Sequence, residues 1–326
     1  MTRETFMYSI GIDLGGTNIA VGLCDKDLNL IDKISAPTLP KRGSEAVVKD
    51  MVELTKKLTE RSGVSFSDIV SVGIATPGSV NPRTGVVEAA FNLGFSDFPI
   101  VETFKKHFPK ENVLVANDAN AAALGEALAG AAHGTKNSVM ITLGTGVGGG
   151  VIIDGKIFDG GINTMGAELG HMVISAGGRQ CTCGRRGCFE AYSSATALTA
   201  LTKEKMEELR IKKIPSLLFE ESEREGKVSA RTSFDAMRRG DKYGKALVDE
   251  YIYYLAVGVT NIINIFQPEV LSIGGGVCNE GEYLTKPLIE LVEREQFTRD
   301  SARKTKVLTA ALGNDAGIIG AAGLYR

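Results

Sequence analysis

The sequence predicts an α/β fold, and three observations support that prediction. Apolar runs of strand type, such as 8–13 and 70–75, alternate with longer helical patterns such as 242–266, as in proteins that cover sheets with helices. A strand, a glycine-rich turn and a second strand occur twice along the chain. A buried strand at 113–117 also passes directly into a helix, so ligand-binding side chains are expected at the carboxyl ends of strands.

The individual elements follow from hydrophobic periodicity and turn residues. Strands are expected at 8–13, 19–24, 70–75, 113–117, 138–143, 149–153, 270–274 and 306–310. Helices are expected at 44–62, 118–130, 242–266 and 281–295, and from residue 315 to the end. Ser44 is a suitable N-cap for the first helix, and Gly63 is a suitable stop. The charged stretch 203–240 has few turn signals, and we expect it to form an insertion of surface helices.

Composition disfavours several classes of protein. A net charge of −2, a pI near 6.1 and the lack of a basic stripe argue against nucleic-acid binding. No apolar run approaches about 18 residues, so no membrane span is expected, and the first ten residues are too polar for a signal peptide. The five cysteines, an odd number, favour a reducing cytoplasm.

Glycine is over-represented, at 39 of 326 residues, and short glycine runs form two turns that suit polyphosphate binding. DLGGTN runs from Asp13 to Asn18, and LGTGVGGG runs from Leu143 to Gly150. Such turns direct several backbone N–H groups toward one point. The candidate phosphate ligands are Gly15, Gly16, Thr17, Thr145 and Gly146. Asp13 ends a strand, where a carboxylate suits Mg²⁺ or its waters. Simple tight hairpins are the alternative, and the Walker pattern GxxxxGK[ST] is absent.

Asp118 is the candidate catalytic base. It follows Asn117 where strand 113–117 meets helix 118–130, at the edge where open α/β sheets bind ligands. Phosphoryl transfer needs alignment, charge neutralisation and an acceptor for the proton of the attacking hydroxyl, and a carboxylate supplies that acceptor. Asn117 offers a donor and an acceptor to neighbouring sugar hydroxyls. The alternative is that Asp118 only caps its helix.

A cluster of three cysteines is the most specific signal in the chain. Cys181, Cys183 and Cys188 have the spacing C-x-C-x4-C, and His171 lies ten residues before the first of them. Three thiolates and one imidazole complete a tetrahedral zinc site with no open position, which makes the site structural. A redox pair is a weaker alternative because CxxC is absent, and a chance cluster is weaker still.

Two glutamates flank these metal ligands. Glu168 precedes His171 in ELGH, and Glu190 follows Cys188 in CFE. A zinc ion would hold both carboxylates and the imidazole in a fixed relation, as recognition of sugar hydroxyls requires. With one ring nitrogen on the metal, His171 presents the other to a neighbour or a ligand. The alternative for each glutamate is a solvated surface charge.

Six motifs, in this order, resemble the ROK family of bacterial sugar kinases and repressors: DLGGTN, TPG, NDANAAALGE, TLGTGVGGG, ELGH and CTCGRRGCFE. The resemblance covers roughly 8–200 and 242–325 and is weakest across 203–240. Within the family the chain is most similar to ATP-dependent glucokinases. That similarity implies transfer of the γ-phosphate of ATP to the 6-hydroxyl of glucose. It also implies the two-domain actin-like ATPase (ribonuclease H-like) fold with an interdomain active-site cleft.

The resemblance implies a role for each matching residue. Asp118 would be the general base. The sugar contacts would be Asn92, Asn117, Asp118, Glu168, His171 and Glu190. The ligands of a structural Zn²⁺ would be His171, Cys181, Cys183 and Cys188. The contacts to ATP and Mg²⁺ would be Asp13, Gly15, Gly16, Thr17, Thr145, Gly146, Gly275 and Gly276. Many relatives carry a tryptophan in the segment of Asn92, where this chain has Phe95 and no tryptophan at all.

The resemblance also implies an organisation and a set of partners. A small domain would comprise 1–117 with 312–326, and a large domain, 118–311, would carry the zinc loop and the insertion 203–240. The partners would be a sugar and a nucleotide, with no nucleic acid and no membrane. The chain would act in the cytoplasm as a homodimer or higher homo-oligomer.

Three alternatives stay open at this point. The acceptor could be fructose, N-acetylmannosamine, N-acetylglucosamine or allose, and polyphosphate could replace ATP. A ROK repressor is disfavoured because only about seven residues precede strand 8–13, too few for a helix-turn-helix. An actin-like structural or chaperone ATPase would have no obvious use for the zinc cluster.

Overall fold

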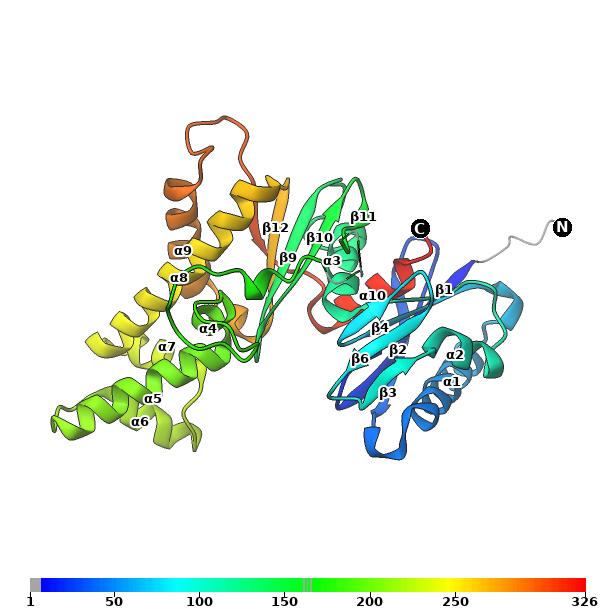
Figure 1. The fold of residues 1–326 in the computed structure, drawn as a ribbon, viewed down its shortest axis with the longest axis horizontal. Coiled ribbons are helices and arrows are strands. Elements are labelled where there is room, and N and C mark those ends of the chain that lie inside the picture. The colour runs from blue at the N-terminus through cyan, green and yellow to red at the C-terminus, as the bar shows by residue number, and fades with distance from the viewer. Residues whose placement is uncertain (1–6, 161, 163, 165) are drawn as a thin grey trace. The chain divides into compact units, whose positions relative to one another are not determined.

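The computed structural model describes residues 7–160, 162, 164 and 166–326, and the chain divides into two compact units (Figure 1). The first unit comprises Met1–Met140, Gly150–Ala167 and Ala310–Arg326, and the second comprises Ile141–Gly149 and Glu168–Thr309. The C-terminal segment therefore belongs with the N-terminal residues. Residues 118–140 lie in the first unit, although they were predicted to belong to the large domain, 118–311. That domain boundary stays a prediction.

The first unit is built on a five-stranded sheet of order β3-β2-β1-β4-β8. Its strands are β1 (Tyr8–Leu14), β2 (Asn18–Cys24), β3 (Leu30–Pro37), β4 (Ile69–Thr76) and β8 (Val113–Asn117). β1 pairs antiparallel with β2 and parallel with β4, and β4 pairs parallel with β8. Asp13 lies opposite Ala75, and Thr76 lies opposite Asn117. The carboxyl ends of three parallel strands thus bring Asp13 and Asn117 to the same edge of the sheet.

A second five-stranded sheet repeats this order as β11-β10-β9-β12-β13. Its strands are β9 (Ser138–Leu143), β10 (Val147–Ile153), β11 (Lys156–Ile157), β12 (Val270–Gly274) and β13 (Lys306–Thr309). In both sheets the strands follow the order third, second, first, fourth, fifth, which confirms the predicted repeat of strand, turn and strand. A smaller sheet contains β5 (Ser79–Asn81), β6 (Val86–Ala90) and β7 (Phe95–Phe98).

Helices of the first unit cover its sheet on both faces. They are α1 (Ser44–Arg61), α2 (Ile100–His107), α3 (Asp118–Ala129) and α10 (Ala316–Gly323). On one face, Ile12 of β1 shares a buried core with Met51 of α1 and Phe104 of α2. Because successive side chains of a strand point to opposite faces, Gly11 and Asp13 lie on the other face, where α10 contacts β1 and β4.

α10 packs on the sheet and on α3 through direct backbone contact. A Cβ atom on Gly11 would lie 1.9 Å from the carbonyl oxygen of Ile318. A Cβ atom on Gly320 would lie 1.7 Å from the carbonyl oxygen of Ala121 in α3. Only glycine permits such approaches. The glycines therefore allow the sheet, α10 and α3 to form one closely packed assembly.

A buried glutamate fastens the returning C-terminal segment to this assembly. The Glu126 carboxylate of α3 accepts hydrogen bonds from the N–H groups of Ala131 at 2.6 Å, Ala311 at 3.0 Å and Leu312 at 2.8 Å. Its side chain is fully buried, and charge-assisted donors of this kind satisfy a buried carboxylate. Glu126 thus fixes the chain immediately before α10.

The second unit is mostly helical outside its strands. Its helices are α4 (Glu190–Ser193), α5 (Ala195–Ile211), α6 (Leu217–Glu225), α7 (Ala230–Arg238), α8 (Lys242–Phe266) and α9 (Glu282–Glu295). The 3₁₀ helices of the chain are η1 (Pro40–Arg42), η2 (Phe66–Asp68), η3 (Leu169–His171), η4 (Gly276–Glu280) and η5 (Gly313–Asp315). The stretch 203–240 forms the end of α5 together with α6 and α7, as predicted.

α8 is long and apolar enough to cross a membrane, but 61% of its most apolar window is buried inside the protein, as in a core helix.

The limits of α1 illustrate what sequence signals resolve. The predicted N-cap Ser44 is instead the first helical residue, and Gly43 precedes it. The predicted stop is confirmed: Gly63, with φ 65°, donates to the carbonyl of Glu60, and Val64 donates to that of Thr59, which is a Schellman ending. β3 and the strands of the small sheet lie outside the predicted elements because they are short or half exposed and carry polar residues.

We expect Gly320→Ala to lower the free energy of unfolding by about 2 kcal/mol or more, because the added methyl group overlaps a backbone carbonyl that cannot move aside cheaply. Denaturant unfolding measures the change. Gly144→Ala is the control, since no atom lies within 4 Å of its Cβ position. Wild-type stability in the Gly320 variant would contradict the close contact of α3 with α10.

Candidate functional site

The first glycine turn joins β1 to β2 in the first unit. The Gly15 N–H donates to the Asn18 carbonyl at 2.9 Å, and Thr38 donates its hydroxyl to the Gly15 carbonyl at 2.6 Å. Thr17 at the tip is exposed. A Cβ atom on Gly16 would lie 3.1 Å from the side-chain nitrogen of Asn92. Hydrogen bonds at Gly15 therefore stabilise the base of the turn, while its tip stays exposed to solvent. The predicted sugar contact Asn92 lies next to Gly16.

Asp13 and Asp118 are two shielded carboxylates of the same unit that interact electrostatically. Burial, together with the charge of Asp118, raises the pKa of Asp13 to about 6. Burial also raises the pKa of Asp118, and the hydrogen bond from the Ala119 N–H opposes that rise. Two carboxylates in a shielded site repel one another, which favours a proton or a cation between them.

The structure separates the roles of Asn117 and Asp118. Asn117 is the N-cap of α3, since its side-chain oxygen accepts from the N–H groups of Ala119 at 2.9 Å and Asn120 at 3.2 Å. Asn117 therefore takes the N-cap position that the alternative gave to Asp118, and Asp118 is the first helical residue, with Oδ1 accepting from the Ala119 N–H at 2.8 Å. The Asn117 amide nitrogen donates to the Gly78 carbonyl at 3.1 Å, and a hydrogen bond from the Asn117 side chain to the Asp118 carboxylate opposes the rise of the Asp118 pKa.

The second glycine turn joins β9 to β10 at the boundary of the second unit. Gly144 donates its N–H to the carbonyl of Gly146 at 3.0 Å, and Ala195 at the start of α5 donates to the Gly144 carbonyl at 2.8 Å. A Cβ atom on Gly146 would lie 2.2 Å from a carboxylate oxygen of Glu190. The absence of a side chain at Gly146 thus makes room for Glu190, a reason that the sequence did not reveal.

Glu190 links this turn to the cysteine loop. One carboxylate oxygen accepts from the Val147 N–H at 3.1 Å, and the other accepts from the hydroxyl of Thr182 at 3.0 Å and from the Cys181 thiol at 3.6 Å. Glu190 begins the short helix α4. It therefore fixes the relative position of a glycine turn and a candidate metal loop, and keeps lone pairs for further donors. Glu168, at the N-cap of η3, is exposed.

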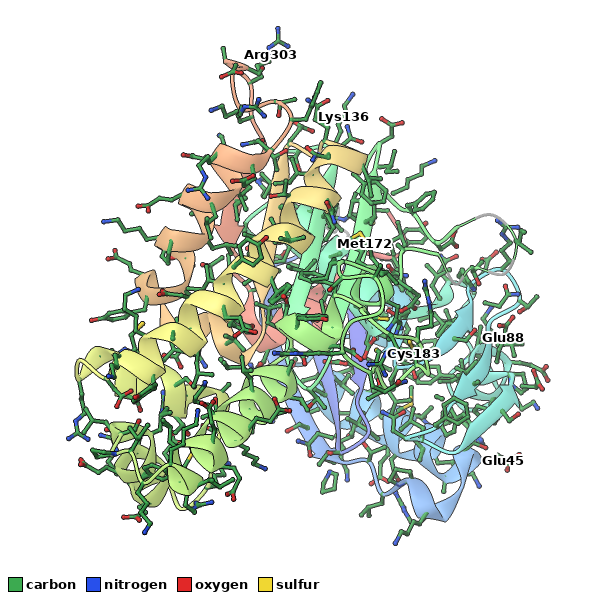
Figure 2. The ribbon with its side chains drawn as sticks, turned by 60° about the vertical axis from the view of Figure 1, so that its left-hand side comes forward. Glu45, Glu88, Lys136, Met172, Cys183 and Arg303 are labelled. Atoms are coloured by element: carbon green, nitrogen blue, oxygen red, sulfur yellow. The ribbon has the colours of Figure 1, made fainter. Side chains whose placement is uncertain are left out.

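The predicted metal ligands come together in the second unit, and Figure 2 labels Cys183, one of them. One ligand atom from each of His171, Cys181, Cys183 and Cys188 lies within 4.8 Å of the others. The Cys183 and Cys188 sulfurs are 3.7 Å apart, and the Cys181 sulfur is 3.7 Å from Nδ1 of His171. Zn–S bonds of about 2.3 Å at tetrahedral angles place two sulfurs about 3.8 Å apart, so the four side chains fit a zinc ion.

Local backbone geometry produces this convergence. Gly184 and Gly187 both have positive φ, 88° and 84°, and a Cβ atom on Gly187 would lie 1.8 Å from the Ser175 carbonyl oxygen. Burial raises the pKa of the Cys188 thiol to about 12, whereas the hydrogen bond from the Arg185 N–H lowers the pKa of Cys183. A metal ion must therefore displace the Cys188 proton in order to bind.

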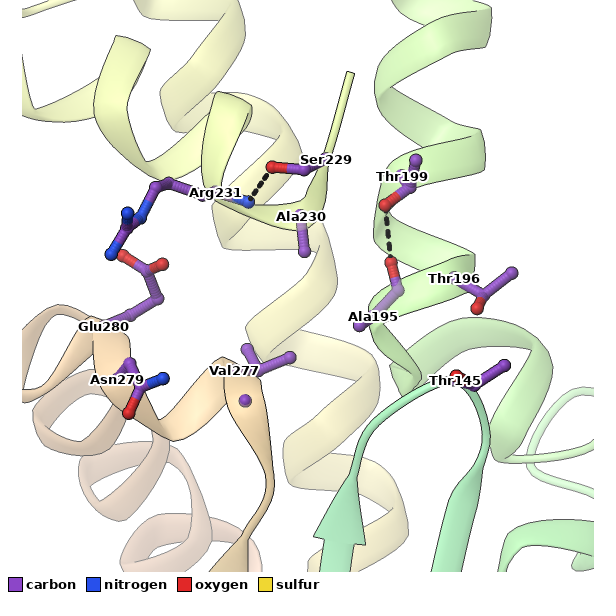
Figure 3. A pocket seen from close by; sticks show the side chains of 11 residues that line it. Thr145, Ala195, Thr196, Thr199, Ser229, Ala230, Arg231, Val277, Asn279 and Glu280 are labelled. Atoms are coloured by element: carbon purple, nitrogen blue, oxygen red, sulfur yellow. Dashed lines mark hydrogen bonds between the residues drawn. The ribbon is translucent and has the colours of Figure 1, made fainter. Parts of the chain in front are cut away.

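A cavity of about 530 Å³ lies within the second unit (Figure 3). Its floor includes Thr145 of the second turn and Gly276, two of the predicted nucleotide residues. Gly275 has φ 91°, and a Cβ atom there would lie 2.4 Å from the Leu143 carbonyl oxygen, so this glycine brings η4 against β9. The remaining lining residues were not predicted: Ala195, Thr196, Thr199, Ser229, Ala230, Arg231, Val277, Asn279 and Glu280.

These unpredicted residues come from the start of α5, the start of α7 and η4. One signal in the sequence could have located the start of α7: Ser229 and Thr232, three residues apart, form a capping box. The predicted residues thus fall into two groups. Asp13, the first turn, Asn92, Asn117 and Asp118 share the first unit, while the second turn, Glu168, the metal ligands, Glu190, Gly275 and Gly276 share the second.

A model of the ROK family matches residues 9–326. The chain belongs to the ROK family. This ROK chain is 36% identical to a glucokinase of Halalkalibacterium halodurans over 98% of its own length and 95% of that protein. A ROK hexokinase of Thermus thermophilus superimposes with a TM-score of 0.80 at 33% identity, covering 97% of both chains.

A second solved structure carries ligands. A ROK glucokinase of Streptomyces griseus, in complex with glucose and AMPPNP, superimposes on this ROK chain with a TM-score of 0.77 at 31% identity, covering 97% of this chain and 98% of that one. These likenesses confirm the predicted family and the two-domain actin-like ATPase fold, which ROK sugar kinases share.

We expect Asp13→Asn to stabilise the ligand-free protein at alkaline pH. The folded-state pKa of about 6 exceeds the usual 3.8. Ionised Asp13 therefore lowers the free energy of unfolding. This penalty is absent below pH 4, where the carboxyl is protonated, and it is fully present once the pH has risen through 6. The variant should match wild type near pH 4 and exceed its free energy of unfolding by on the order of 2 kcal/mol at pH 8.

Denaturant unfolding across this pH range measures the difference. Asp300→Asn removes a carboxylate whose side chain is 96% exposed, and it should track wild type at every pH. A pH-independent effect of Asp13→Asn would contradict the buried carboxylate pair.

Proposed function

We propose that this chain is an ATP-dependent glucokinase that forms glucose 6-phosphate and ADP. Asp118 carries the proposal. It is a shielded carboxylate at the first position of α3 that interacts electrostatically with Asp13; Oδ1 accepts from the Ala119 N–H at 2.8 Å, and Asn117 is the N-cap of the helix. The glucokinase relatives and the glucose–AMPPNP complex of a ROK glucokinase support glucose and ATP as the substrates.

In this proposal Asp118 accepts the proton of the sugar 6-hydroxyl while that oxygen bonds to the γ-phosphorus and ADP leaves. The raised pKa makes the Asp118 carboxylate a stronger base than an exposed aspartate. Proton acceptance and alignment are the main demands of phosphoryl transfer on protein side chains. The same shielding implies that turnover declines as pH falls and Asp118 becomes protonated.

The two glycine turns are proposed to hold the phosphates, and Asp13 to lie near Mg²⁺. The exposed tip of the first turn and Thr145 of the second present backbone N–H groups and hydroxyls. When bound, Mg²⁺ neutralises phosphate charge, and a divalent cation beside Asp13 would relieve its repulsion by Asp118. The cavity lined by η4 and α7 has the size and polarity for the nucleoside of ATP.

The sugar is proposed to bind Asn92, Asn117, Glu168, His171 and Glu190 as well as Asp118. Asn117 lies next to Asp118 and hydrogen-bonds to its carboxylate, and Nε2 of His171 is left for a ligand if Nδ1 binds zinc. Glu190 keeps lone pairs beyond those used by Val147 and Thr182. Directional partners of this kind match the hydroxyls of a hexose.

We further propose that His171, Cys181, Cys183 and Cys188 hold a structural zinc ion. Bound zinc would cross-link the loop and orient His171 and Glu190. A cytoplasmic location suits the unpaired cysteines, and a homodimer or higher homo-oligomer is proposed from the family. A hexose panel with ATP and polyphosphate tests the substrate assignment directly.

Asp118→Asn should lower kcat for glucose phosphorylation by about 10² or more, because the proton acceptor is lost while the shape of the site is kept. Glucose binding, measured by calorimetry, should change little. Asp249→Asn, which removes one partner of an exposed surface ion pair with Lys245, should retain wild-type kcat. Near-normal turnover by Asp118→Asn would remove Asp118 from its proposed role.

Zinc removal should lower thermal stability, because a structural metal binds only the folded chain. We expect one zinc per chain by elemental analysis, and a loss of metal and a lower Tm in Cys183→Ser. Cys278→Ser, outside the cluster, should keep its zinc. A metal-free wild-type protein with full activity would rule out the zinc proposal.

A further inference from the structure

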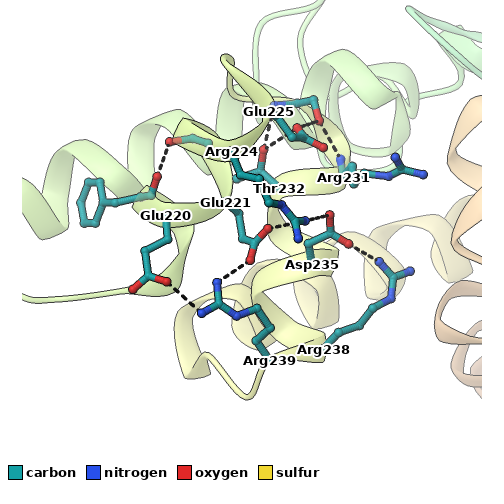
Figure 4. A network of polar contacts seen from close by, with 12 residues as sticks. Glu220, Glu221, Arg224, Glu225, Arg231, Thr232, Asp235, Arg238 and Arg239 are labelled. Carbon is teal, nitrogen blue, oxygen red and sulfur yellow. Dashed lines mark hydrogen bonds and ion pairs between the residues drawn. The ribbon is translucent and has the colours of Figure 1, made fainter.

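A chain of ion pairs runs through the insertion helices (Figure 4) and continues to Glu280 in the lining of the cavity. It links, in order, Glu220 with Arg239, Arg239 with Glu221, Glu221 with Arg224, Arg224 with Asp235, Asp235 with Arg238, and Arg238 with Glu280. The first five links connect α6 with α7 or with Arg239, the residue that follows α7, or lie within one of these helices. The last link leaves the insertion and reaches η4.

Arg238 makes that last link with one of its guanidinium nitrogens, while another binds Asp235. It ends α7, donates to Asp235 at 2.7 Å and pairs with the Glu280 carboxylate. Its guanidinium also lies 4.6 Å from the ring centre of Tyr283. Glu280 is only 7% exposed, so its charge is largely shielded from solvent and depends on Arg238 for compensation.

The ion pair joins two opposite walls of the cavity. Glu280 ends η4, a five-residue 3₁₀ helix that contributes Val277 and Asn279 to one wall. The other wall is the beginning of α7, with Ser229 and Arg231, as Figure 3 shows. Because α7 is a single continuous helix from Ala230 to Arg238, a contact at its end fixes η4 relative to the residues at its start.

Without Arg238, the Glu280 carboxylate would be left shielded and unpaired, a state that buried charges avoid. Glu280 lines the cavity, so the accessible route to solvent is into the cavity itself. Rotation of its side chain would bring negative charge toward a polyanionic nucleotide and displace η4 from α7. Both effects weaken nucleotide binding.

Resting on the proposed function, we propose that Arg238 is a positioning residue for the nucleotide: it holds Glu280 against α7 and so sets the width and charge of the nucleoside cavity. The neighbouring Arg239 offers a matched contrast. It belongs to the same ion-pair chain, but its partners Glu220 and Glu221 lie on α6 and do not line the cavity.

The experiment compares Arg238→Gln, Arg238→Lys and Arg239→Gln with wild type. Arg238→Gln should raise KM for ATP and the calorimetric Kd for Mg-ADP by about tenfold, leaving KM for glucose and kcat within about twofold. Arg238→Lys should recover part of the affinity, since a lysine supplies the charge but not the forked geometry. Arg239→Gln should lose thermal stability yet bind Mg-ADP like wild type.

Three results would overturn the inference: equal effects of Arg238→Gln on both Michaelis constants, wild-type Mg-ADP affinity in Arg238→Gln, or weakened Mg-ADP binding in Arg239→Gln. If Arg238→Gln fails to fold, Arg238→Lys carries the test, and wild-type Mg-ADP affinity in that variant would overturn the inference. Wild-type protein that binds Mg-ADP but does not phosphorylate glucose would refute the proposed function and leave the inference intact. Wild-type protein that binds no Mg-ADP would refute both.

Discussion

The backbone contact of α10 with the first sheet and with α3 is the constraint on which the candidate catalytic centre depends. Gly11 and Gly320 remove the side chains that would separate these elements. Their close approach places the start of α3 near the end of β1, and so Asp118 near Asp13. The repulsion between the two carboxylates follows from this packing. The packing is also why a Mg²⁺-nucleotide complex would be favoured at this edge of the sheet.

Glu126 adds a second constraint to the same assembly. Its buried carboxylate holds Ala311 and Leu312, the residues that follow the crossing of the chain from the second unit back to the first at Ala310. α3 therefore carries Asp118 at its beginning and anchors the returning chain near its end. Three N–H donors to one buried carboxylate fix the position of the returning chain, because hydrogen bonds are directional. Apolar contacts alone would allow that chain to shift along α3.

The second unit is organised around Glu190 and Arg238, two charged residues that join elements distant in sequence. Glu190 connects the cysteine loop with the second glycine turn, and Arg238 connects the insertion helices with η4. Each is partly shielded from solvent, so each interaction is less screened than a surface ion pair. The insertion 203–240, which has the weakest family resemblance, thus supplies part of the wall of the cavity.

Sequence alone determined the features that local chemistry encodes. The α/β class, the repeated strand–turn–strand units and the convergence of His171 with three cysteines follow from periodicity, glycine clusters and ligand spacing, which act over a few residues. Tertiary structure alone decided that Asn117 rather than Asp118 caps α3. It also decided that Gly146 makes room for Glu190 and that α7 lines a cavity with η4. Those outcomes depend on contacts between segments far apart in the chain, and no local pattern records which atoms will compete for the same space.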